Sequence, residues 1–162
     1  SYIKGHYTDD VSNPEAYRMS GMGAANVGPE FTMNEYDALA ELEQEEIKHF
    51  EAGSIPQLSH ITRVLWQQVY ESGRWKKWLH GDEVGKDLSE VSSERQLWLV
   101  KTGCRYIWQK AETLVARQLL YDNLKYVGVN AEEVVLMRIE HNMDKYYRAF
   151  NLIDLNDMLG DL

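Results

Sequence analysis

The sequence predicts an α/β fold that gives way to helices: the last strands and helices of a (β/α)8 TIM barrel, followed by a mostly helical extension. Two strand-like segments alternate with two helix-like segments over residues 1–52. This order is typical of parallel strands joined by right-handed crossovers. Over residues 53–162 apolar residues recur at helical spacing and no further strand is convincing. We therefore expect two regions, 1–52 and 53–162.

The first β/α unit is predicted between Tyr2 and Met19. Residues 2–7 are rich in aromatic and β-branched types and alternate weakly, which favours a short strand. Asn13 and Pro14 then resemble a helix N-cap followed by proline at the first helical position. A short helix is therefore expected up to about Met19.

The second β/α unit begins with the small residues 24–27, a predicted strand that Gly28 and Pro29 end because proline cannot donate to a β-ladder. Thr32 and Glu35 match a T-x-x-E capping box, so a long helix is expected to begin there. Four glutamates on this helix are interpreted as a solvated face: Glu41, Glu43, Glu45 and Glu46.

Two β/α units do not make a closed sheet. Parallel strands need cover on both faces and partners at both edges. The chain also opens at Ser1, without a methionine, directly on a strand-like pattern. We therefore expect an incomplete barrel, which a missing N-terminal barrel portion or a partner subunit would complete.

The extension is predicted to hold several helices. Leu58 to Val69 marks one, and residues 72–89 are expected to be irregular surface with a helical turn near Trp75. A long helix is predicted from Ser93 to about Tyr126, and another begins at Asn130. The five tryptophans are interpreted as packing residues rather than a sugar-binding platform.

Composition excludes some partners. Seventeen basic residues against 26 acidic ones give a net charge of -9, which disfavours nucleic acid and anionic lipid. No apolar run reaches the length of about 18 residues that a membrane span needs. The single cysteine, Cys104, rules out an internal disulfide framework and is consistent with a cytoplasmic protein.

Polar residues lie at the C-terminal ends of both predicted strands, the end where α/β barrels carry their active sites. His6 is the candidate metal ligand, because imidazole binds zinc and titrates near neutrality. Asp9, Asn26 and Glu30 are the candidate catalytic residues. Asn26 offers a donor and acceptors to a polyol, and Glu30 supplies a second carboxylate.

Thr8, Asp10 and Gly28 are candidate substrate-binding residues in the same two segments. Other interpretations remain open. The Thr8–Asp10 segment could cap the turn that follows it, and a single histidine after a strand is more often a structural hydrogen-bonding group than a metal ligand. Asn26 needs a partner if it is buried.

These segments carry a family resemblance. The pair G-H-x-T-D and V-G-P-x-x-T resembles the C-terminal strands of the non-catalytic subunit of class II D-tagatose-1,6-bisphosphate aldolase. Residues 75–82 are similar to a W-x-x-Y-x-H-G segment of that family, and residues 105–108 to its R-Y-Y-W. The likeness runs in the same order from about Ile3 to about Leu124. The matching residues of the first two motifs are Gly5, His6, Thr8, Asp9, Val27, Gly28, Pro29 and Thr32.

The resemblance implies a barrel related to metal-dependent class II aldolases, with a divalent metal that we expect to be zinc. In that superfamily a histidine near the penultimate strand binds the metal, and an asparagine of a following N-V segment contacts substrate. His6 and Asn26 match these two positions. Tyr7–Asp10 departs from the family's phosphate loop, because two acids would repel a phosphate dianion. An unphosphorylated sugar or sugar acid therefore stays open beside a sugar phosphate.

Three functions remain after this comparison. The first is an accessory subunit, a lyase component that stabilises a catalytic partner in an oligomer. The second is a catalytically active, metal-dependent ketose or sugar-acid aldolase or epimerase acting on an unphosphorylated substrate. The third is a helical binding domain without catalysis.

Overall fold

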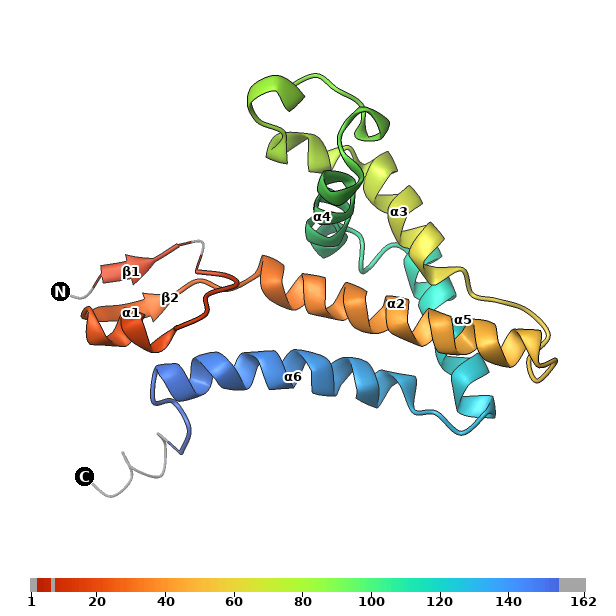
Figure 1. The fold of residues 1–162 in the computed structure, drawn as a ribbon. Helices are drawn as coiled ribbons and strands as arrows, with labels where there is room; N and C mark the ends of the chain where they lie inside the picture. Colours follow the sequence, from red (N-terminus) through yellow and green to blue (C-terminus); the bar gives the residue numbers. More distant parts are fainter. Residues whose placement is uncertain (1–2, 7, 155–162) are drawn as a thin grey trace.

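The computed structural model describes residues 3–6 and 8–154 and shows a small parallel sheet at one end of a helical body (Figure 1). The sheet pairs β1 (Ile3–Gly5) with β2 (Met22–Ala25), and α1 (Glu15–Met19) joins them. The body consists of α2 (Pro29–Glu51), α3 (Ile61–Ser72), α4 (Ser93–Gly103), α5 (Ala111–Tyr126) and α6 (Ala131–Ala149). Short 3-10 helices lie between them: η1 (Arg74–Trp78), η2 (Gly81–Glu83), η3 (Leu88–Glu90) and η4 (Cys104–Tyr106).

The TIM-barrel prediction is wrong. The described residues hold a single pair of strands, with Ile3 opposite Met22 and Gly5 opposite Ala25, and the rest is helical or irregular. In a barrel, the helix after the second strand would fold back over the sheet. Here α2 instead runs away from the sheet and packs against α3, α4, α5 and α6 (Figure 1). The predicted order of strand, helix, strand and helix is confirmed, as is the parallel pairing.

The hydrophobic core lies in the helical body and not around the sheet. The strands read I-K-G and M-G-A-A and have few large apolar side chains; Ile3 is 69% exposed. α2, which the prediction grouped with the strands in residues 1–52, supplies Leu39 and Leu42 to the core. Other large members include Ile61, Leu65, Val69, Trp75, Leu99, Val100, Ile107, Leu120, Leu124 and Val135.

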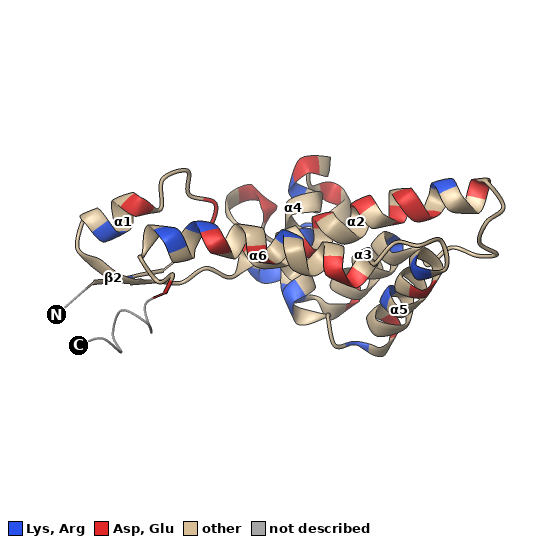
Figure 2. Ribbon diagram, turned by 90° about the horizontal axis from the view of Figure 1, so that it is seen from below, with Lys and Arg blue, Asp and Glu red and all other residues tan. Residues whose placement is uncertain are grey.

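Acidic residues lie along α2 (Figure 2), but Glu43 and Glu46 are buried, so the helix is only partly solvated, contrary to the sequence interpretation. Glu46 is fully buried and accepts hydrogen bonds from Ser59 and from Asn123 Nδ2, the latter at 2.6 Å. Glu43 is also buried and accepts from the amide and hydroxyl of Thr62. The first residues of α3 have no side-chain cap of their own. These two glutamates therefore satisfy backbone and side-chain donors around the start of α3.

The single long helix predicted from Ser93 to Tyr126 is two helices, α4 and α5. The chain turns through η4, which places Cys104 and Ile107 in the core with no exposed surface. At the start of α4 the hydroxyl of Ser92 accepts from the Arg95 amide at 3.3 Å. The start of α6 is as predicted, since Asn130 Oδ1 accepts from the Glu133 amide.

α6 runs antiparallel to α2 and returns the chain to the sheet (Figure 1). Its last residue, Ala149, accepts a hydrogen bond from Arg18 Nε of α1 at 3.1 Å. Among the described helices, none is long and apolar enough to cross a bilayer.

Candidate functional site

The loops that follow β1 and β2 are bound to each other. The Asn26 amide donates to the Gly5 carbonyl at 3.1 Å. In return the Thr8 hydroxyl donates to the Asn26 carbonyl at 2.8 Å, and the Thr8 amide also points to it. Thr8 is buried, at 3% exposure. A Cβ on Gly5 would lie 2.7 Å from Met22 Sδ and 2.8 Å from Thr8 Cγ2, so a larger residue here would force these two side chains to shift.

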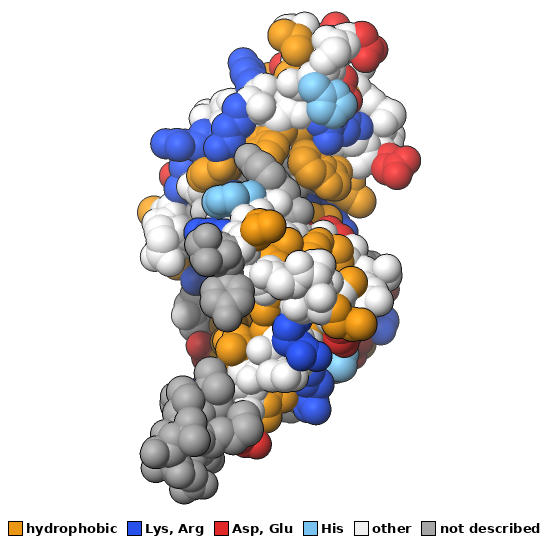
Figure 3. Space-filling model, turned by 90° about the vertical axis from the view of Figure 1, so that its left-hand side faces the viewer, with side chains coloured by type: hydrophobic (Ala, Val, Ile, Leu, Met, Phe, Trp, Pro, Cys, Tyr) orange, Lys and Arg blue, Asp and Glu red, His pale blue; other side chains and the backbone are white. Residues whose placement is uncertain are grey.

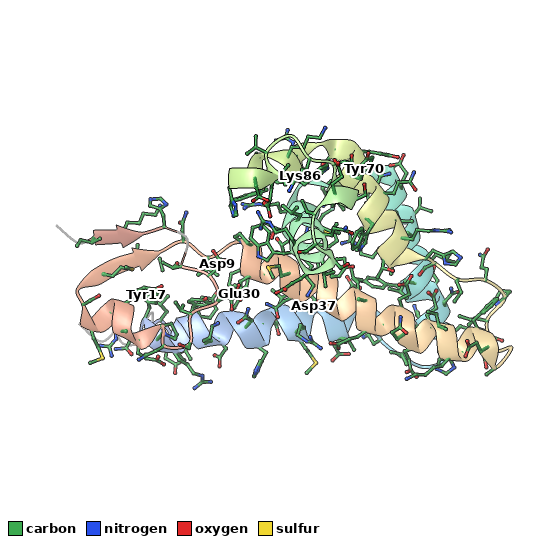
Figure 4. The ribbon with its side chains drawn as sticks, turned by 45° about the horizontal axis from the view of Figure 1, so that its top comes forward. Asp9, Tyr17, Glu30, Asp37, Tyr70 and Lys86 are labelled. Carbon is green, nitrogen blue, oxygen red and sulfur yellow. The ribbon has the colours of Figure 1, made fainter. Side chains whose placement is uncertain are left out.

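Asp9 caps the start of α2 from another part of the chain. Its Oδ1 accepts from the amides of Gly28 and Glu30, both at 2.9 Å. Gly28 occupies the N-cap position and has no side chain to take those donors itself. A carboxylate also suits the positive end of the helix dipole. Figure 4 shows Asp9 and Glu30 where the strand loops meet α2. The helix begins at Pro29, so the T-x-x-E box predicted at Thr32 does not mark its start.

Glu30 is the centre of a polar cluster that joins three segments. Its side chain is 5% exposed, and Oε2 accepts from the Asp10 amide at 2.8 Å. Lys145 Nζ of α6 lies 2.5 Å from Oε1. The Tyr146 hydroxyl donates to Oε2 and lies 3.2 Å from the Thr8 carbonyl oxygen. The Tyr146 ring also packs edge-on against Phe31, with centroids 6.1 Å apart.

The protonation states of Glu30 and Tyr146 are fixed at neutral pH, with the carboxylate ionised and the phenol protonated. Burial alone would raise the pKa of Glu30, but hydrogen bonds from Lys145, Tyr146 and the Asp10 amide outweigh it and lower the pKa. Burial, and then the bond to Glu30, raises the pKa of the Tyr146 phenol. A general acid or base works best with a pKa near the working pH. Glu30 and Tyr146 are shifted away from neutrality in opposite directions, so they suit a fixed structural link better than proton transfer.

The Asp10 carboxylate is repelled by the other carboxylates of this cluster. Its pKa is raised by partial burial and then by the like charges of Glu30 and Asp9. Its backbone is in the left-handed region, with φ of 55°, a conformation that aspartate and asparagine tolerate better than most residues. Asp10 therefore turns the chain so that its amide reaches Glu30, while its carboxylate faces solvent.

The predicted site residues divide into two groups. The structure brings Thr8, Asp9, Asp10, Gly28 and Glu30 together in one hydrogen-bonded junction. The other two predicted residues are exposed, on the loops beside this junction: His6 and Asn26. Asn26 takes part through its backbone, so the buried amide side chain that the sequence suggested is not found.

The junction also contains residues that the sequence did not single out for it. No sequence pattern pointed to Lys145, because a single lysine on a helix is normally solvated. Tyr146 lies in a helical repeat of apolar residues with Val135, Ile139 and Met143, which fits its 6% exposure but does not indicate its hydrogen bond to the strand loop. The separation of 116 residues from Glu30 hides this contact from any local pattern.

A scan against models of protein families found no match to this chain, and searches of the curated proteins and of the solved structures found none either. The choice among the three functions therefore depends on the motifs and on the geometry of the junction.

Proposed function

We propose that this chain is a non-catalytic component of a cytoplasmic class II ketose-bisphosphate aldolase, similar in role to the accessory subunit of tagatose-bisphosphate aldolase. The motif resemblance between Ile3 and Leu124 supports this family. The observation that carries the accessory role is how the motif residues are used. Thr8 and Asp9 are committed to hydrogen bonds that join the strand loops to each other and to α2.

A zinc site within the described residues does not fit this geometry. A catalytic zinc takes three protein ligands. His6 is one imidazole, and two of the three nearby carboxylates already have partners: Asp9 accepts from two helix amides and Glu30 from Lys145 and Tyr146. No group of three or more histidine, cysteine, aspartate or glutamate side chains in residues 3–6 and 8–154 is placed to hold a metal ion. On this proposal the metal and the sugar bisphosphate bind to a catalytic partner.

An accessory component acts by binding the native form of its partner, which stabilises that form by mass action. The chain offers a helical body with its own core for this purpose, and the junction fixes the strand loops on it. The free energy comes from association, so the effect should depend on the concentration of this chain.

The test is an assay of retro-aldol cleavage of tagatose 1,6-bisphosphate with a class II aldolase catalytic subunit, with and without this chain. We expect no turnover by the chain alone. In the mixture we expect a complex by light scattering and a longer half-life of the activity at raised temperature. His6→Ala should leave both effects unchanged, because His6 is exposed and outside the junction.

Other outcomes select the other functions. Metal bound by the chain alone, with turnover of a ketose that His6→Ala abolishes, would replace the accessory role with the catalytic one. A folded chain that neither binds the catalytic subunit nor changes its half-life would leave a helical binding domain with a different partner.

A further inference from the structure

Cationic side chains gather around Tyr106 on the surface formed by η1 and η4. Lys77 Nζ lies 4.3 Å from the centroid of the Tyr106 ring, and Lys77 also donates to its hydroxyl. The guanidinium carbons of Arg74 and Arg105 lie 5.3 and 5.5 Å from the same centroid. Lys76, in the same turn as Lys77, lies over the Trp75 ring. We call Arg74, Lys76, Lys77, Arg105 and Tyr106 the basic platform.

The four cations of the basic platform have no ion-pair partner in the described part of the chain. Other exposed cations such as Lys4, Arg63 and Lys125 also lack one there, so these four are distinguished by gathering around one aromatic turn. The chain has 26 acidic residues, so carboxylates are not scarce. Contact with an aromatic ring offsets only about 0.5–1 kcal/mol per exposed cation. The gathered like charges therefore favour an anion from outside.

The platform is held on a rigid support. Trp75 is fully buried and its Nε1 donates to the Tyr70 carbonyl at 3.2 Å. Gly73, with φ of 62°, provides the left-handed turn that leads from α3 into η1. On the other side, the buried Cys104 anchors η4. The backbone that carries the exposed cations is therefore held in place, so binding has to order only their side chains.

The platform lies beside the start of α2. The Arg105 Nη2 atom is 3.8 Å from the position that a Cβ on Gly28 would take. Figure 3 shows lysine and arginine side chains over the upper part of one face, at the level of the 3-10 helices. The cations therefore border the same junction that the proposed accessory function uses.

We propose that the basic platform docks an acidic segment of a partner protein. A nucleic acid is disfavoured because its many phosphates would be repelled by the chain as a whole, whose net charge is -9. One phosphate is disfavoured because the point around which Arg74, Lys77 and Arg105 gather is occupied by the Tyr106 ring. Several carboxylates spread along a segment can each meet one cation. Arginine pairs well with carboxylate, and arginine and tyrosine are enriched at protein interfaces.

The partner assignment depends on the proposed function, since the acidic segment would then belong to the catalytic aldolase subunit. The first measurement is independent of it. Binding of a fluorescent peptide rich in glutamate and aspartate is followed by anisotropy, for the wild-type chain and for R74E/K77E/R105E. We expect a loss of affinity of at least about tenfold in the variant, and weaker wild-type binding as salt rises.

The matched control is the triple variant K4E/R63E/K125E, which changes the net charge equally at exposed residues outside the platform. It should keep most of the wild-type affinity. If circular dichroism shows that the reversal variant does not fold, R74Q/K77Q/R105Q replaces it. Equal losses in the platform and control variants would overturn the proposal, as would displacement of the peptide by millimolar inorganic phosphate.

The same variants are then mixed with the catalytic aldolase subunit. Subunit binding that only the platform variant loses supports the proposal and its partner. Subunit binding that the platform variant keeps overturns the assignment of the acidic segment to that subunit and leaves the accessory function standing. Peptide binding through the platform without any subunit binding supports the platform and overturns the accessory function.

Discussion

The Tyr146 hydroxyl donates a hydrogen bond to the carboxylate of Glu30, 116 positions earlier in the chain. This contact joins the first turn of α2 to the last turns of α6. Because the same carboxylate accepts from the Asp10 amide, it also ties the loop after β1 to both helices. The strands themselves bury little apolar surface, so these polar contacts are what position them on the helical body.

Removing the Tyr146 hydroxyl tests this link. Tyr146→Phe keeps the ring against Phe31 but leaves a buried carboxylate with one donor fewer. We expect the free energy of unfolding to fall by about 1–3 kcal/mol in urea denaturation. Tyr147→Phe is the matched control, because Tyr147 is 43% exposed, and it should change stability by less than about 0.5 kcal/mol. A similar small change in both variants would mean that the Glu30 contact is not stabilising.

The lowered pKa of Glu30 predicts a pH dependence of stability. Its ionised form is favoured in the folded state relative to the ordinary value of 4.5. Its contribution is therefore fully present above that value and is lost as the pH falls through the lower, folded-state pKa. The stability difference between wild type and Glu30→Gln should be constant from about pH 7 to pH 5 and should shrink below pH 4.5. A difference that grew on acidification would contradict this assignment.

The pKa of Asp10 is shifted in the opposite direction to that of Glu30, so its effect on stability has the opposite sign. Its pKa in the folded state is raised above the ordinary value of 3.8, so its ionised form is disfavoured by folding. Asp10→Asn keeps a residue that tolerates positive φ and removes the repulsion from Glu30 and Asp9. The variant should be more stable than wild type at pH 7, and this advantage should disappear as the pH falls below about 3.8. A less stable variant at pH 7 would indicate that the Asp10 carboxylate has a favourable role.

The sequence predicted the local elements well where local chemistry determines them. Asn130 caps α6 as expected, and the order of strands and helices around Pro14 and Pro29 is right. The barrel could not be tested locally, because whether α2 folds back over a sheet depends on its contacts with α6, about a hundred residues later. The second strand was predicted at residues 24–27, whereas the structure has it at Met22–Ala25.

The same reason explains which site residues were found. Asp9 and Glu30 were identified by their place after the strands, and the structure does bring them together. Their roles depend on partners such as Lys145 that no motif indicates. Glu43 and Glu46 show the same limit, since a run of glutamates looks solvated until Thr62 and Asn123 are placed against it.

The buried Glu46 predicts a second destabilising change. Asn123→Ala removes the amide that donates to Glu46 Oε1 at 2.6 Å and to the Gln57 carbonyl at 3.0 Å. Because Glu46 has no exposed surface, water does not replace the lost donor. We expect a loss of about 2–3 kcal/mol in denaturant unfolding, against a change within about 0.5 kcal/mol for Gln118→Ala, whose partner contact is exposed. Equal changes in the free energy of unfolding of the two variants would show that the buried contact with Glu46 adds no more stability than the exposed one.

Gly103 at the end of α4 predicts an effect that depends on a single neighbour. A Cβ at this position would lie 2.6 Å from Cγ1 of Val69, a fully buried and stiff side chain in α3. Gly103→Ala should therefore cost about 1–3 kcal/mol, although alanine is the better helix former by about 1 kcal/mol. In a Val69→Ala background the clash is absent, so the same substitution should cost nothing or stabilise the chain. A double-mutant cycle by urea denaturation measures this coupling. Equal costs in both backgrounds would mean that the close packing of α4 on α3 is not what selects glycine.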